Sequence, residues 1–181
     1  MSVDDRRRWE QRYRSQPPAR PDDIGLPRPF RPSAHVFPHS GNALDLACGR
    51  GTAAVWLASR GLTVCGYDIS PTAVEAAQAL AEASGSRDRC RFRVADLDDG
   101  IPPGEPVDVL LCTMFRAPRL FGAMIDRVGR GGLLAVSVLS EVGAAPGRFR
   151  APGGELMRAF GALEVITAGE AGGQAWLLAR R

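Results

Sequence analysis

The chain has 181 residues, of which 45% are hydrophobic, so it is long enough for one globular domain with a full core but short for two. No stretch approaches the roughly 20 apolar residues that a membrane span needs, and the N-terminus lacks the apolar segment of a secretory signal. We therefore expect a cytoplasmic protein without a membrane partner, and the net charge of +3 gives little support to a nucleic-acid substrate.

The cysteines and histidines show no metal-binding pattern. Cys48, Cys65, Cys90 and Cys112 are widely spaced single residues, so they predict neither a disulfide framework nor a zinc site. His35 and His39 are four residues apart, but Pro38 lies between them, which disfavours a shared helix face. We expect no bound metal.

The N-terminal part reads as a helix followed by a connector. Residues 4–14 predict a helix that carries Trp9 and Tyr13 on one face. Six prolines between residues 15 and 32 predict an irregular or extended segment. We therefore separate residues 1–34, a helix and connector that could act as a lid, from a main domain over residues 35–181.

From residue 42 onward, apolar strand patterns alternate with helical patterns. Ser70 is a favourable N-cap, and Pro71 fits the first position of the helix that follows it. The strands are predicted over residues 42–47, 62–67, 89–95, 107–112, 131–139, 162–168 and 174–180, and the helices over 52–60, 71–83, 117–128 and 153–161. This alternation predicts a Rossmann-like α/β fold with seven strands, six of them parallel and one reversed by a final hairpin, and helices on both faces.

Polar and glycine residues follow the first three predicted strands. Gly49 and Gly51 lie in the turn after the first strand, Asp68 ends the second, and Asp96 follows the third. Ligands of open parallel sheets bind beyond the carboxyl ends of the strands. A carboxylate at Asp68 is well placed to accept hydrogen bonds from ribose hydroxyls, while glycine permits close backbone approach.

With these residues, the stretch ALDLACGRGTAAVWLASRGLTVCGYDISPTAVEAAQ resembles the core of class I S-adenosylmethionine-dependent methyltransferases. It is most similar to small bacterial enzymes of the tellurite-resistance and thiopurine type. The resemblance covers residues 42 to about 139 well and extends more weakly over residues 147–166. It implies a methyltransferase (EC 2.1.1.-) that uses S-adenosylmethionine and methylates a small molecule.

The resemblance also implies roles for individual residues. The methionine half of the cofactor is expected near Asp45, Ala47, Gly49 and Gly51, with backbone contacts from Cys112 or Thr113. The ribose and adenine are expected at Asp68, Ile69, Asp96 and Leu97. The chain departs from the fullest family motif at Ala47, where glycine is common.

Three alternatives stay open at this point. Residues 49–54 also satisfy the dinucleotide pattern G-x-G-x-x-A, as in a nicotinamide-dependent oxidoreductase, although Asp45 favours a methyltransferase. Asp96 could be an ordinary turn carboxylate. The chain could also bind the cofactor without catalysis.

We expect the methyl acceptor at residues that follow the fourth and fifth strands. Met114, Phe115, Arg116 and Arg148 are the candidates, with Trp9 and Tyr13 closing the site from the N-terminal helix. Several arginines would favour an anionic acceptor, but they could equally be part of a solvated surface. The DNA-methylase motif Asn/Asp-Pro-Pro-Tyr is missing after the fourth strand, we assign no catalytic base, and no oligomeric state is predicted.

Overall fold

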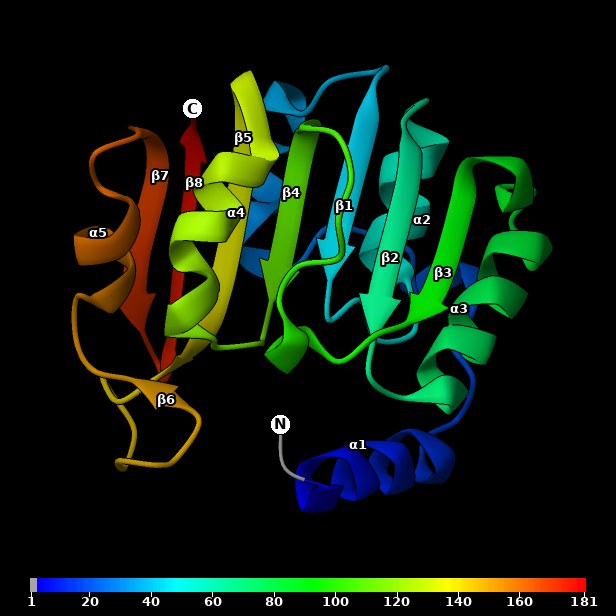
Figure 1. The fold of residues 1–181 in the computed structure, drawn as a ribbon, viewed down its shortest axis with the longest axis horizontal. Coiled ribbons are helices and arrows are strands. Elements are labelled where there is room, and N and C mark those ends of the chain that lie inside the picture. The colour runs from blue at the N-terminus through cyan, green and yellow to red at the C-terminus, as the bar shows by residue number, and fades with distance from the viewer. Residues whose placement is uncertain (1–2) are drawn as a thin grey trace. The chain divides into compact units, whose positions relative to one another are not determined.

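The computed structural model describes residues 3–181 and divides the chain into two compact units (Figure 1). The first unit contains the chain up to Pro27 together with Pro38–Pro103, and the second contains Arg28–Phe37 and Gly104–Arg181. The boundary that we place at residue 34 from the sequence stays a prediction.

The first unit is built on three parallel strands in the order β3-β2-β1. They are β1 (Asn42–Leu46), β2 (Thr63–Asp68) and β3 (Cys90–Val94). Helix α2 (Thr52–Ser59) connects β1 to β2, and α3 (Pro71–Ala83) leads from β2 toward β3. As predicted, Ser70 caps α3, because its hydroxyl oxygen accepts a hydrogen bond from the Ala73 amide, and Pro71 begins the helix.

Helix α1 (Val3–Ser15) lies beyond the carboxyl ends of the three strands in this unit (Figure 1). It packs against α3. Three short 3-10 turns, η1 (Pro21–Asp23), η3 (Arg87–Arg89) and η4 (Leu97–Asp99), complete the unit. The end of the sheet where ligands bind in open α/β folds is therefore the end that faces α1.

The second unit is built around the long strand β5 (Val128–Ser140). Strand β4 (Val107–Thr113) and the two-residue β6 (Arg150–Ala151) pair with β5 in parallel. Strand β8 (Gln174–Arg180) pairs antiparallel with both β5 and β7 (Glu164–Ala171). The helices are α4 (Phe121–Arg127) and α5 (Glu155–Phe160), with 3-10 segments η2 (Arg28–Val36) and η5 (Pro118–Leu120).

The predicted fold class, a mostly parallel Rossmann-like α/β sheet with one reversed strand, is confirmed. The reversed strand is β8, which belongs to the predicted C-terminal hairpin. Two local expectations are wrong. The connector does not stay irregular to residue 32, because η2 begins at Arg28, and the helix expected from residue 117 begins as the 3-10 turn η5.

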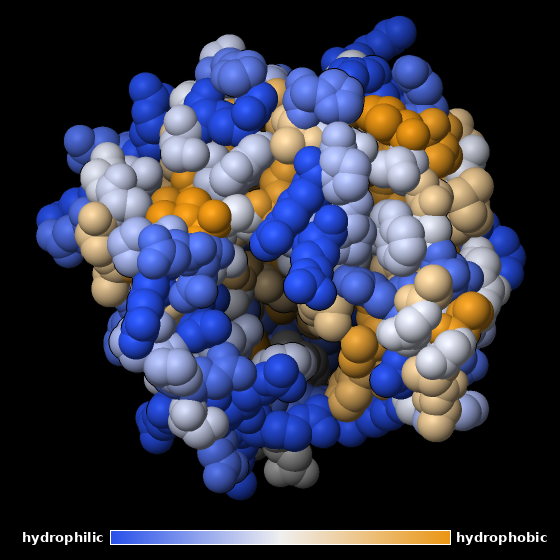
Figure 2. Space-filling model, turned by 180° about the vertical axis from the view of Figure 1, so that it is seen from behind, coloured by the Kyte–Doolittle hydropathy of each residue, from blue (hydrophilic) through white to orange (hydrophobic). Residues whose placement is uncertain are grey.

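The surface in Figure 2 is mostly hydrophilic, and its hydrophobic residues lie in separate small groups. Among the residues whose burial the structure describes, five large hydrophobic side chains are exposed, namely Val94, Met114, Val142, Phe149 and Met157. Within residues 3–181, no helix is both long enough and apolar enough to cross a membrane.

Candidate functional site

Asp68 ends β2 and holds together two turns of the first unit. Its side chain is buried, with 4% of the residue exposed. One carboxylate oxygen accepts the Gly49 amide at 2.8 Å, and the other accepts the Ser70 amide at 3.0 Å. Burial raises the pKa of Asp68 above its ordinary value, although the hydrogen bonds from Ser70 and Gly49 oppose this rise. Each carboxylate oxygen has a second lone pair, so Asp68 keeps the capacity to accept ribose hydroxyls.

The turn between β1 and α2 has a left-handed backbone at three positions. The φ angles are 54° at Ala47, 53° at Gly49 and 77° at Gly51. Alanine is strained in this region, which explains why glycine suits position 47. A Cβ atom built on Gly51 would lie 2.7 Å from the Ala77 Cβ. Gly51 therefore permits close packing of the turn against α3.

Asp45 on β1 is a second buried carboxylate, with 2% of the residue exposed. Burial, and after it the negative charge of Asp68, raises the pKa of Asp45 to about 8. Two carboxylates in this environment repel each other, and a cationic ligand would relieve that repulsion. S-adenosylmethionine carries a positive sulfonium and a positive ammonium group, so these acidic residues fit it.

Helix α1 places Tyr13 directly beside the glycine turn. The Tyr13 hydroxyl lies 2.9 Å from the position that a Cβ atom on Gly49 would take. Burial, together with the charge of Asp68, raises the pKa of Tyr13. Trp9 stacks on Tyr13 with 6.1 Å between ring centroids. The first unit therefore brings both predicted lid aromatics to the end of the sheet that carries Asp68.

The adenine candidates lie in and before η4. Asp96 caps this turn, because its side chain accepts the Asp98 amide at 2.9 Å. A guanidinium nitrogen of Arg6 on α1 lies 4.0 Å from the Asp96 carboxylate. Leu97 and Ile69 are buried. The capping bond gives Asp96 a structural role of its own, and its contact with adenine stays a prediction.

The second unit holds the remaining candidates at and after the end of β4. Cys112 is buried, and its sulfur lies 3.7 Å from the Phe115 carbonyl oxygen. Thr113 and Phe115 are half-buried, while Met114 is 50% exposed. Met114 has a φ of 58°, an uncommon angle for a residue with a long side chain. Such strain is typical of functional positions.

The two candidate arginines of the second unit differ in their surroundings. Arg116 forms two hydrogen bonds with the Glu155 carboxylate, at 2.7 and 2.5 Å, and this interaction raises the pKa of Arg116. Arg148 is exposed and lies over the Phe149 ring, 5.1 Å from its centroid. The Arg116 guanidinium therefore already has an anionic partner within the protein.

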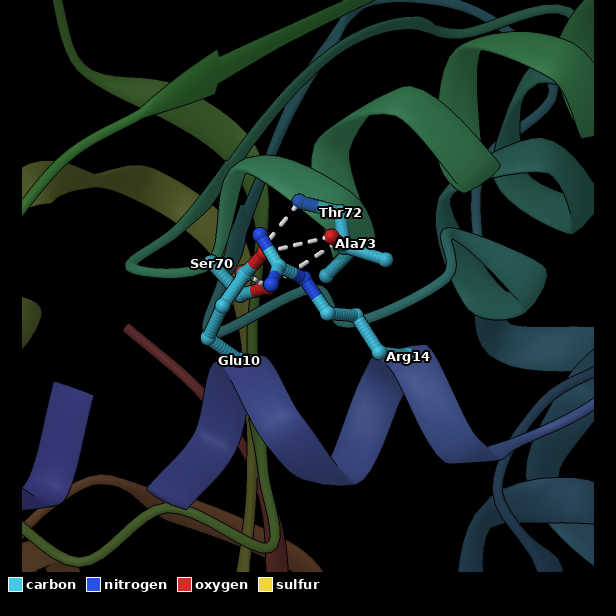
Figure 3. A network of polar contacts seen from close by, with 5 residues as sticks. All are labelled: Glu10, Arg14, Ser70, Thr72 and Ala73. Atoms are coloured by element: carbon cyan, nitrogen blue, oxygen red, sulfur yellow. Dashed lines mark hydrogen bonds and ion pairs between the residues drawn. The ribbon is translucent and has the colours of Figure 1, made fainter. Parts of the chain in front are cut away.

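One residue of the site escaped the sequence-based prediction. Glu10, between Trp9 and Tyr13 on α1, contacts Ser70 and Thr72 at the beginning of α3 (Figure 3). These groups are about 60 positions apart in the chain, and no local pattern links them. The capping preference of Ser70 was the only sequence signal near this contact.

Comparison with known proteins finds similarity to methyltransferases. A family model described as a methyltransferase domain matches residues 43–132, about half of the chain. The 2-heptyl-1-hydroxyquinolin-4(1H)-one methyltransferase of Mycobacteroides abscessus is 35% identical over 97 residues, which cover 50% of this chain and 42% of that protein. An uncharacterized RNA methyltransferase of Nitratidesulfovibrio vulgaris is 45% identical over 53 residues, which cover 29% of this chain and 11% of that protein.

The fold has close counterparts among solved structures. TehB from Haemophilus influenzae superimposes with a TM-score of 0.74 at 20% identity, over 86% of this chain and 62% of that chain. The chain spans less than half the length of the two curated relatives that it matches.

Proposed function

We propose that this chain, a class I S-adenosylmethionine-dependent methyltransferase similar to TehB, transfers a methyl group to a small-molecule acceptor. S-adenosylmethionine is the cofactor of its family. The observation that carries the proposal is the pair of buried carboxylates, Asp45 and Asp68, which flank the glycine turn beneath Tyr13. Such a pair suits a ligand that combines two positive groups with ribose hydroxyls.

Each residue near the glycine turn has a proposed task in holding the cofactor. Asp68 accepts the ribose hydroxyls, and Ile69 packs on the adenine, whose edge is recognised by Asp96 and the Leu97 amide. The methionine half lies along Ala47, Gly49 and Gly51, and its positive charge favours the ionised form of Asp45. Backbone groups of Cys112 or Thr113 bind its amino group.

The acceptor is proposed to approach from Met114 and Phe115. These residues directly follow β4, and side chains at strand ends are the usual ligand contacts of this fold class. Exposed apolar surface at Met114 and Phe149 suits an apolar part of a small molecule. Arg116 is paired with Glu155, so its guanidinium is less available to an anionic group of the acceptor.

The methyl-transfer step requires little from the protein beyond binding and orientation of the reactants. When bound, the cofactor supplies an electrophilic methyl group on its sulfonium. The chain must hold the acceptor at a near-attack distance and keep water away, and Tyr13 and Trp9 on α1 are placed to exclude water. We assign proton removal to no side chain, so an acceptor that is already a good nucleophile fits best.

Methyl transfer can be tested with S-adenosylmethionine labelled on the methyl group. The candidate acceptors are offered separately, namely hydroxyquinolones, thiols, small phenols and bulk RNA. Transfer of the label is followed by mass spectrometry. Transfer to a small molecule supports the proposal. Transfer to RNA alone contradicts the acceptor class, and cofactor binding without transfer to any acceptor contradicts catalysis.

A further inference from the structure

A single carboxylate on α1 binds the beginning of α3 (Figure 3). One oxygen of Glu10 accepts the Ser70 hydroxyl at 2.5 Å and the Thr72 amide at 3.4 Å. The other oxygen accepts the Thr72 hydroxyl at 2.5 Å. Three donors from α3 and its cap therefore converge on one side chain of α1. We call these contacts the Glu10 latch.

The electrostatics favour the ionised form of Glu10 at this position. The first amides of a helix lack intrahelical partners, and the helix dipole places partial positive charge there. Arg14, one turn along α1, donates to Glu10 at 3.0 Å. Partial burial raises the pKa of Glu10, but the hydrogen bonds from Ser70 and Thr72 outweigh this effect and leave that pKa below its ordinary value.

The Glu10 latch is connected at both ends to the cofactor site. On the α3 side, the Ser70 amide donates to Asp68, which in turn accepts the Gly49 amide. On the α1 side, Tyr13 lies three residues beyond Glu10, and its hydroxyl lies beside Gly49. Glu10 and Tyr13 lie on the same helix, so the contact that Glu10 makes with α3 also fixes the position of Tyr13 beside Gly49.

Two weaker contacts hold the ends of α1 and the start of the connector. Arg6 lies 4.0 Å from Asp96, with 54% of the Arg6 side chain exposed. Arg50 donates to the Pro17 carbonyl oxygen. An exposed ion pair contributes little, whereas the Glu10 latch joins three donors to one carboxylate.

We infer that Glu10 is a positioning residue, which holds α1 over the cofactor site and thereby sets how fast cofactor and demethylated product exchange. This inference rests on the proposed function, since it concerns the same site. The latch joins protein groups only, and it forms without a bound ligand. Breaking it lowers the barrier to entry and exit alike and changes the equilibrium affinity little.

The test compares Glu10→Gln, Thr72→Val and the double variant with the parent. Glu75→Gln is the matched control, because Glu75 is an exposed residue of α3. Association and dissociation rates of S-adenosylhomocysteine are measured by stopped-flow tryptophan fluorescence. Trypsin cleavage at the arginines of α1, measured without added ligand, reports release of the helix independently of cofactor binding.

Glu10→Gln is expected to speed both rates about tenfold, as the loss of a charged hydrogen bond implies, while the dissociation constant stays within about threefold. Trypsin is expected to cleave α1 faster. The double variant should be no faster than Glu10→Gln, because both changes break the same latch. Unchanged exchange rates, or additive effects of the two changes, would overturn the inference. A parent that binds no S-adenosylhomocysteine overturns the proposed function instead, and the trypsin result then decides the latch alone.

Discussion

The folded environment changes the ionisation of the Asp45 carboxyl group. This group is buried beside the charge of Asp68, and its pKa rises from 3.8 to about 8. The folded protein therefore binds a proton at Asp45 that the unfolded chain releases above about pH 4. Between these two pKa values, protonation of Asp45 favours the folded state.

This difference makes stability depend on pH in a defined direction. The contribution of Asp45 is fully present below pH 3.8 and is lost as the pH rises toward about 8. Asp45→Asn keeps the shape of the protonated side chain without the ionisation. We expect the melting temperatures of parent and variant to be similar at low pH, and the variant to be the more stable by several degrees at pH 9. Parallel melting curves at all pH values would contradict this assignment.

Gly49 offers a second prediction at the scale of one residue. Gly49 and Gly85 both have a left-handed backbone, at φ 53° and 69°, but only Gly49 has a side chain, Tyr13, against it. Alanine should destabilise both positions through backbone strain, by about 1–2 kcal/mol. Only Gly49→Ala should also push Tyr13 away and speed trypsin cleavage of α1. Equal cleavage of the two variants would show that Tyr13 does not lie against Gly49.

Arg116 is expected to act through Glu155 rather than through the acceptor. Arg116→Met leaves the Glu155 carboxylate, whose side chain is 14% exposed, without its two strong hydrogen bonds. We expect a loss of about 1–3 kcal/mol in the free energy of unfolding, measured by urea denaturation. Arg148→Met, at an exposed position, should change stability by less than about 0.5 kcal/mol. A larger loss of stability in Arg148→Met than in Arg116→Met would contradict this, and Arg116 would again be a candidate for contact with the acceptor.

At the scale of elements, α1 is the part whose function can be separated from the rest. It carries Trp9, Glu10 and Tyr13 toward the end of the sheet where Asp68 lies. Deleting residues 1–16 should lower turnover more than cofactor affinity, because water exclusion depends on the helix while the ribose contact does not. Steady-state kinetics together with calorimetric titration separate the two. Equal turnover in the truncated protein would contradict a lid.

Most elements follow from their local sequence. The apolar residues of β1, β2 and β4 form short runs that are typical of strands buried within a sheet. Ser70 followed by Pro71 predicts the start of α3 from the local sequence alone. Strand β6 could not be predicted, since two residues have no periodicity and pair only because β5 passes beside them. The 3-10 turns of η2 likewise depend on proline geometry that composition alone does not specify.

For the molecule as a whole, the candidate site residues at strand ends could be predicted from the sequence, whereas the contacts between separate elements could not. Asp45, Asp68 and the glycine turn lie where a parallel sheet must place them. The packing role of Gly51 could not be predicted from the sequence, because the residue it packs against, Ala77, lies on α3. The latch at Glu10 was hidden for the same reason. Contacts over long sequence separations are set by packing, which no local pattern encodes.

Binding of S-adenosylmethionine through Asp68 can be tested by one calorimetric experiment. S-adenosylhomocysteine is titrated into the parent and into Asp68→Asn, which keeps the shape but removes the charge. We expect binding to the parent and a loss of at least about tenfold in affinity in the variant, because charged hydrogen bonds to the ribose are lost. Equal affinities in two folded proteins, or binding of NAD in place of S-adenosylhomocysteine, would contradict it.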